Sequence, residues 1–164
     1  MAKVVCFDQS TRCSGYAYFL DGEYVESGVI DMNKSKLDTD ERSFEMAKEL
    51  WKILKKYKPE YAIIENVQKQ TSINITLVLA RLQGMIIGYA EAHGVKVHIL
   101  PPTTWRKSLS FNQGPKIKRA ELKQQSIDYV KKHYGIDVTD DQSDAICLGV
   151  AAHKIFDFDD LWGN

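Results

Sequence analysis

The chain places carboxylates where apolar segments begin or end. Asp8 follows the apolar run 4–7, Glu65 follows the apolar run 61–64, and Asp141 and Asp144 open a third apolar stretch. An ionised carboxylate against an apolar core costs several kcal/mol unless a cation neutralises it. No comparably placed cation stands beside Asp8 or Glu65, and such hard oxygen ligands are those of Mg²⁺ when it activates water for phosphodiester cleavage. The pattern predicts a divalent-metal site built from three distant segments.

Length and composition indicate one globular domain. With 164 residues, 44% of them hydrophobic, the chain can bury one core, and we predict a single domain over residues 1–164. Lys and Arg balance Asp and Glu at 22 each, yet the segment 105–132 holds eight basic residues against two acidic ones. This local excess favours a nucleic-acid surface over a merely solvated helix face. Its residues are Arg106, Lys107, Lys116, Lys118, Arg119, Lys123, Lys131 and Lys132.

Cysteine usage and hydropathy bear on the cellular compartment. Cys6, Cys13 and Cys147 are odd in number and lack the paired spacing of a zinc site, so we expect reduced thiols in a cytoplasmic protein. The four histidines share no metal-binding spacing either. No run approaches ~18 consecutive apolar residues, and the N-terminus lacks a signal-peptide pattern. We therefore expect no membrane segment.

Periodicity predicts an α/β order of elements. Three strands, the last two joined by a tight Asp21-Gly22 turn, precede a helix that Pro59 stops. A short, almost wholly apolar strand follows, which favours a central position covered on both faces. The predicted strands span 4–7, 15–20, 24–31, 61–65 and 95–100, and the predicted helices span 38–57, 72–92, 118–134 and 140–156.

This order is that of the ribonuclease H-like fold, a mixed five-stranded sheet with helices on both faces. In that arrangement the first and fourth strands are neighbours, so their carboxyl ends bring Asp8 and Glu65 together. Asp141 and Asp144 are three residues apart and share one face of the last helix. Thr139 followed by Gln142 is a capping-box pattern that starts this helix.

The motifs around these acids resemble those of RuvC-like Holliday-junction resolvases. The matching segments are Phe7-Asp8 with its polar, Gly-containing turn, Ile64-Glu65, and Asp141-x-x-Asp144-Ala145. The resemblance implies that Asp8, Glu65, Asp141 and Asp144 are catalytic metal ligands for Mg²⁺, with Mn²⁺ as a substitute. It also implies a catalytic or phosphate-binding lysine at Lys118. The expected DNA-binding set is Arg106, Lys107, Lys116, Lys118 and Arg119.

The resemblance further implies the substrate and the setting. Branched DNA, above all the four-way junction, is the expected partner, cut by paired nicks. The segment 101–107 is similar to the phage- and poxvirus-encoded branch, which places the protein in a host cytoplasm. Bacterial members carry an aromatic residue shortly after the second acid, whereas this chain has Val67, Gln68 and Lys69 there. We therefore expect recognition of junction shape with relaxed sequence preference.

The segment 72–92 carries more apolar residues than one core-facing stripe of ~100° requires. Two interpretations stay open: a helix buried within its own domain, or the seam of a two-fold homodimer that sets two active sites on opposite strands of a junction.

Other functions fit parts of the pattern. An RNA-DNA hybrid ribonuclease would use the same four acids. An actin-like nucleotide-binding domain also has a first strand that ends in Asp before a Ser/Thr-rich turn, but it needs two such lobes. A catalytically silent DNA-binding subunit would not need the complete acidic set. Taken singly, Asp8 also suits a turn, and acids suit a first helical turn.

Overall fold

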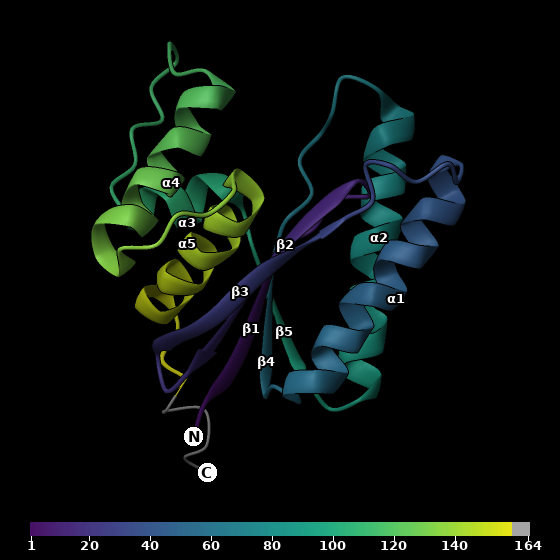
Figure 1. The fold of residues 1–164 in the computed structure, drawn as a ribbon, viewed down its shortest axis with the longest axis horizontal. Coiled ribbons are helices and arrows are strands. Elements are labelled where there is room, and N and C mark those ends of the chain that lie inside the picture. Colours follow the sequence, from purple (N-terminus) through teal and green to yellow (C-terminus); the bar gives the residue numbers. More distant parts are fainter. Residues whose placement is uncertain (159–164) are drawn as a thin grey trace.

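The computed structural model describes residues 1–158 and contains one mixed five-stranded sheet (Figure 1). The strand order is β3-β2-β1-β4-β5. The pairs β1–β2 and β2–β3 are antiparallel, whereas β1, β4 and β5 run parallel to one another. The predicted α/β arrangement is confirmed. The strands are β1 Lys3–Asp8, β2 Cys13–Leu20, β3 Glu23–Asp31, β4 Tyr61–Glu65 and β5 Lys96–Leu100.

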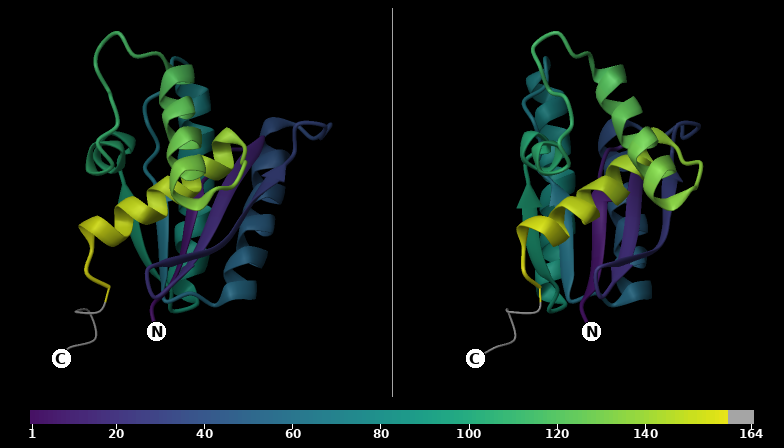
Figure 2. Two further views of the ribbon diagram at one scale, coloured as in Figure 1. Left: turned by 60° about the vertical axis from the view of Figure 1, so that its left-hand side comes forward. Right: turned by 90° about the vertical axis from the view of Figure 1, so that its left-hand side faces the viewer.

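Helices cover both faces of the sheet. Figures 1 and 2 show α1 and α2 on one face and α3, α4 and α5 on the other. Side chains of β1 and β4 alternate between the two cores, as a period of two requires. Val4 and Cys6 pack on the α5 face, while Val5 and Phe7 pack on the α1 face. The helices are α1 Thr39–Tyr57, α2 Ile73–Ala92, α3 Pro102–Ser108, α4 Arg119–Tyr134 and α5 Asp140–Ile155.

This alternation decides where the strand-end acids lie. Val4 and Cys6 face α5, so Asp8, two residues further, belongs to the same face. On β4, Tyr61 and Ile63 face α5 as well, and Glu65 follows them with the same period. Both acids therefore point to the side of the sheet that carries α3, α4 and α5.

The ends of the elements follow local chemistry. The Asp38 side chain accepts a hydrogen bond from the Glu41 N–H and caps α1, and Gly135 ends α4 with a left-handed φ of 69°. Thr139 caps α5 as predicted, but only half of the expected capping box forms: the Gln142 side chain donates to Ser27 on β3. Helix α3 was not predicted from the sequence; Pro102 opens it, because proline suits a first helical turn.

One face of α2 is left uncovered. Leu82, Ile86 and Ala90 are buried against the sheet and α1, whereas Ile73 and Leu77 are 66% and 46% exposed. The expected apolar excess is thus present and lies on the surface. By length and composition alone, α2 could also cross a membrane. Core helices of globular proteins meet the same criterion.

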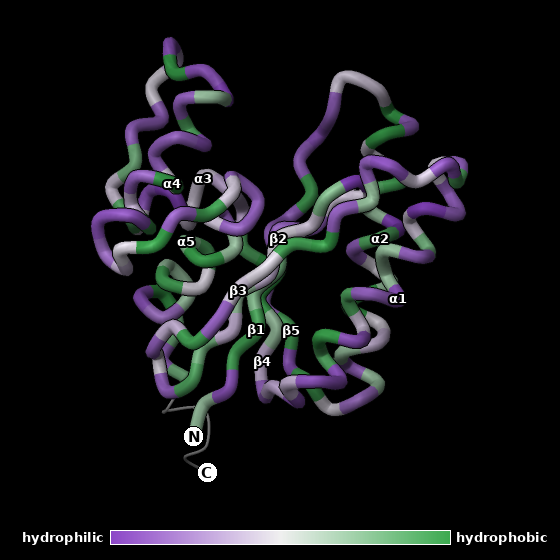
Figure 3. The backbone as a smooth tube through the Cα atoms, in the orientation of Figure 1, coloured by the Kyte–Doolittle hydropathy of each residue, from purple (hydrophilic) through white to green (hydrophobic). Residues whose placement is uncertain are grey.

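Hydrophobic residues run through the central strands, and hydrophilic ones are frequent in the loops beyond the ends of β1 and β4 (Figure 3). Two loops, 66–72 and 109–118, project at that end of the molecule in all views (Figures 1 and 2). They flank the sheet edge at which Asp8 and Glu65 lie.

Candidate active site

Four acids from three elements line one cavity of about 290 Å³. Asp8 ends β1 and Glu65 ends β4, and these strands are parallel neighbours with Phe7 paired to Ile64. Asp141 and Asp144 come from the first turns of α5. The carboxyl ends of adjacent parallel strands meet at one sheet edge, where open α/β sheets bind ligands. The structure therefore brings together all four predicted acids.

Gly15 lets α5 reach the sheet edge. A Cβ at position 15 would overlap the backbone carbonyl of Asp141, so only glycine permits this approach. The turn between β1 and β2 is tied by its own side chains. Ser14 Oγ accepts from the Ser10 N–H at 2.9 Å and donates to the Ser10 carbonyl at 2.7 Å. The rigid turn and the glycine together hold Asp141 close to Asp8.

Burial makes Asp8, Glu65 and Asp144 harder to ionise, and neighbouring negative charges add to the effect at Asp8 and Asp144. Burial raises the pKa of Asp8 well above its ordinary 3.8, and the charges of Glu65, Asp144 and Asp141 raise it further. Burial also raises the pKa of Asp144 to about 6. The pKa of Glu65 is raised by burial, an effect opposed by its hydrogen bond with Trp105. A divalent cation bound among such carboxylates would neutralise their charge and favour their ionised form.

The donor set fits a hard divalent cation. The four side chains offer carboxylate oxygens, the ligands that Mg²⁺ prefers. Asp144 Oδ1 is buried and makes no hydrogen bond with the part of the chain that the structure describes, which is costly unless something else binds it. Within residues 1–158, however, no three His, Cys, Asp or Glu side chains are already gathered tightly enough to hold a metal ion. The cavity thus contains the right ligands, and binding requires them to draw closer.

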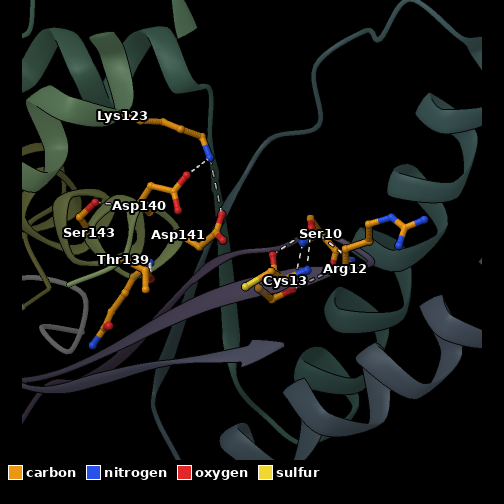
Figure 4. Close-up of polar contacts among 10 residues, drawn as sticks. Ser10, Arg12, Cys13, Lys123, Thr139, Asp140, Asp141 and Ser143 are labelled. Atoms are coloured by element: carbon orange, nitrogen blue, oxygen red, sulfur yellow. Dashed lines mark hydrogen bonds and ion pairs between the residues drawn. The ribbon is translucent and has the colours of Figure 1, made fainter. Parts of the chain in front are cut away.

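Three basic side chains line the same cavity: Arg106 of α3, and Arg119 and Lys123 of α4. Lys123 forms an ion pair with Asp140, and its Nζ lies 4.0 Å from Asp141 Oδ1 (Figure 4). Burial lowers the pKa of Lys123, but the bond to Asp140 outweighs this and leaves the pKa raised. Lys123 therefore stays protonated beside the acids.

The other predicted basic residues lie elsewhere. Lys118 is the exposed N-cap of α4, where its backbone N–H donates to Glu121 Oε2 at 2.7 Å. Lys107 and Lys116 are also exposed, and none of these three lysines lines the cavity. Arg119 and Lys123 are four residues apart and share a face of α4. From the sequence, Lys123 could be placed only in the basic segment, because the direction in which α4 faces is set by its packing on α5.

Two further residues contact Glu65 directly. The Trp105 indole N–H donates to Glu65 Oε2, and the Gln9 side-chain amide donates to the Glu65 carbonyl, both at 2.7 Å. Neither residue was singled out as a site residue from the sequence. Gln9 follows Asp8 directly and Trp105 lies in the segment 101–107, but no spacing rule links either residue to Glu65.

The comparisons with known proteins agree with this geometry. A family model described as crossover junction endodeoxyribonuclease RuvC matches residues 4–152. No curated protein sequence matches the chain.

Solved structures with the same fold include RuvC structures and a yeast mitochondrial resolvase. RuvC of T. thermophilus in complex with a Holliday junction substrate shares 13% identity and a TM-score of 0.73, over 94% of this chain and 96% of that one. A second Thermus thermophilus RuvC structure shares 14% identity and a TM-score of 0.69, over 93% and 96% of the two chains. The yeast mitochondrial Holliday junction resolvase Ydc2 shares 18% identity and a TM-score of 0.55, over 92% and 77%. At these identities the likeness establishes the fold.

Proposed function

The chain belongs to the RuvC family of crossover junction endodeoxyribonucleases, and we propose that it cuts four-way DNA junctions in a reaction that depends on a divalent metal. The observation that carries the proposal is the convergence of Asp8, Glu65, Asp141 and Asp144 in one cavity with a basic wall. Carboxylates repel the phosphates of DNA, so a surface that only bound DNA would bind it more tightly without these four acids. Their presence therefore indicates a role in catalysis.

The four acids are the proposed metal ligands, with Mg²⁺ as the metal and Mn²⁺ as its substitute. When bound, the divalent cation supplies an activated water and charge stabilisation for phosphodiester hydrolysis. Asp8 is close enough to the other three acids for the charge of each to raise its pKa, in addition to the larger effect of burial. Asp144 is buried and Glu65 is half-buried, which limits the access of bulk water to their oxygens.

Arg106, Arg119 and Lys123 are the proposed contacts to the scissile and neighbouring phosphates. They line the same cavity as the acids, and an arginine fork binds phosphate oxygens through paired hydrogen bonds. Lys123 takes the role expected of Lys118 at the reacting phosphate, because it lies beside Asp141. Lys107, Lys116 and Lys118 are proposed to contact the flanking backbone, which positions DNA without reading its sequence.

Relaxed sequence preference is proposed from the loop after β4. Asn66, Val67, Gln68 and Gln70 line the cavity there, and none of them has an aromatic ring to stack on an unpaired base. Membership of the phage-type branch, and with it a host cytoplasm, is proposed from the segment 101–107 alone.

Paired nicks require two active sites, and we propose a homodimer formed through the exposed apolar face of α2. Ile73 and Leu77 lie on that face, and an added Cβ at Gly84 or Gly88 would meet nothing within 4 Å. A two-fold seam along one helix repeats the same contacts on both protomers.

The deciding experiment offers purified protein three substrates: a four-way junction, a linear duplex and an RNA-DNA hybrid, each with Mg²⁺ and with a chelator. Cleavage of the junction alone, abolished by the chelator and by Asp8→Asn, supports the proposal. Cleavage of the hybrid in preference to the junction would identify a ribonuclease, and no cleavage of any substrate would contradict a nuclease function.

A further inference from the structure

Trp105 points its only polar atom at one of the proposed metal ligands. The side chain is fully buried, and its indole N–H donates to Glu65 Oε2 at 2.7 Å. A buried indole needs a hydrogen-bond acceptor, and backbone carbonyls usually provide one. Here the acceptor is a carboxylate that lines the cavity.

The tryptophan is itself held on several sides. Phe111 meets the indole edge-on with ring centroids 5.9 Å apart, and the Arg106 guanidinium carbon lies 4.9 Å from the ring centre. The ring packs in the same core as the α5 residues Ala145 and Ile146. The donor therefore cannot follow Glu65 if that side chain turns away.

Glu65 is thus fixed at both ends. Trp105 holds Oε2, and Gln9 donates to the Glu65 backbone carbonyl at 2.7 Å. Glu65 Oε1 makes no hydrogen bond to another residue of the described range 1–158. One oxygen is occupied by an immobile donor and the other is free for a cation.

We propose that Trp105 is a positioning residue, whose indole N–H orients the Glu65 carboxylate so that Oε1 is presented to the divalent metal. This inference rests on the proposed function of Glu65 as a metal ligand. Hydrogen bonds that orient ligating groups affect metal affinity or activity by about 10- to 100-fold when they are removed. A preoriented ligand also lowers the cost of drawing the four acids together.

Trp105→Phe removes the N–H and keeps an aromatic ring in the core. The matched control is Trp51→Phe, because the Trp51 indole N–H donates to the Met85 carbonyl at 3.1 Å on the other face of the sheet. For Trp105→Phe we expect Mn²⁺ binding, measured by calorimetry without DNA, to weaken by about 10- to 100-fold. We expect junction cleavage to fall within the same range, and junction binding without metal to stay unchanged. Trp51→Phe should retain wild-type metal affinity and cleavage.

A measurement on the wild type guards against a variant that fails to fold. The measurement is the NMR signal of each indole N–H. The chain contains three tryptophans, so NMR spectra of Trp51→Phe and Trp162→Phe assign the indole N–H signal of Trp105 by elimination. Addition of Mg²⁺ should shift that signal and leave the Trp51 signal in place.

An unmoved Trp105 signal at saturating Mg²⁺, or wild-type Mn²⁺ affinity in folded Trp105→Phe, would overturn the inference. Failure of the wild type to cleave any DNA would instead contradict the proposed function. The two failures are separable, because the metal titrations need no DNA.

Discussion

Gly15 and Asp141 touch backbone to backbone: the space that a Cβ of residue 15 would fill is occupied by the Asp141 carbonyl. This contact joins the turn after β1 to the start of α5, and it places Asp141 and Asp144 beside Asp8. The approach is possible only with glycine, so the position of the two α5 acids relative to Asp8 depends on the absence of a side chain at residue 15.

Gly15→Ala should therefore damage catalysis more than the fold. The methyl group must push α5 away from β2, at a cost of about 1–3 kcal/mol in the free energy of unfolding, and the two α5 acids move with the helix. We expect cleavage of the four-way junction to be lost in protein that still unfolds cooperatively. Gly114→Ala is the control, since an added Cβ there lies at an ordinary 3.5 Å from its nearest neighbour. Equal activity of both variants would contradict this account of Gly15.

Asp8→Asn and Glu65→Gln should abolish cleavage and leave junction binding intact or tighter, because the acids repel DNA until a metal neutralises them. Single-turnover cleavage with Mg²⁺ and gel-shift binding with a chelator measure the two properties separately. Normal cleavage by either variant would remove that residue from the proposed ligand set.

Asp144 should make stability depend on pH. Its pKa rises from 3.8 to about 6 in the fold, so the folded chain binds this proton more tightly than the unfolded chain. The free energy of unfolding must then fall as the pH rises from about 4 to about 6, by at most ~3 kcal/mol. Above about pH 6 the ionisation of Asp144 lowers the free energy of unfolding no further.

Metal-free Asp144→Asn should consequently melt at a higher temperature than the wild type near neutral pH, and at a similar temperature near pH 4. Mg²⁺ should stabilise the wild type more than the variant. Asp137→Asn, whose carboxyl is 90% exposed, is the control. A wild type whose thermal stability is flat across this pH range would disprove the assignment.

Lys123→Met should slow cleavage by tenfold or more at saturating junction, because it removes a fixed positive charge beside the reacting phosphate (~10²-fold effects are typical of such groups). Lys118→Met should mainly weaken binding and reduce its salt dependence by about one phosphate equivalent. If Lys118→Met slowed cleavage more than Lys123→Met did, Lys118 and not Lys123 would be the catalytic lysine.

The α2 face gives a test of assembly. Leu77→Glu places a charge on the exposed apolar face and should yield folded monomers that nick only one strand of a junction. Leu82 is fully buried, so Leu82→Glu should unfold the protein instead. Sedimentation velocity and circular dichroism distinguish these outcomes. A wild type that stays monomeric on and off DNA, yet makes symmetric paired nicks, would rule out the dimer.

Much of the fold was readable from local patterns. The apolar runs of β1 and β4 and the helical spacing of α1 each depend on neighbours within a few residues, and all three elements were predicted. The acids Asp8 and Glu65 could be assigned to one sheet edge because parallel neighbouring strands end at the same edge. Thr139 also set the start of α5, since capping is a local interaction.

Contacts between segments that are distant in the sequence could not be read in this way. The Trp105–Glu65 hydrogen bond, the approach of α5 to Gly15 and the position of Lys123 beside Asp141 each depend on how α3, α4 and α5 pack on the sheet. Packing selects one arrangement among many of equal local propensity. Sequence alone determined which carboxylates gather at the sheet edge, whereas tertiary structure decided which side chains orient and balance them, because those interactions arise only once the layers have closed.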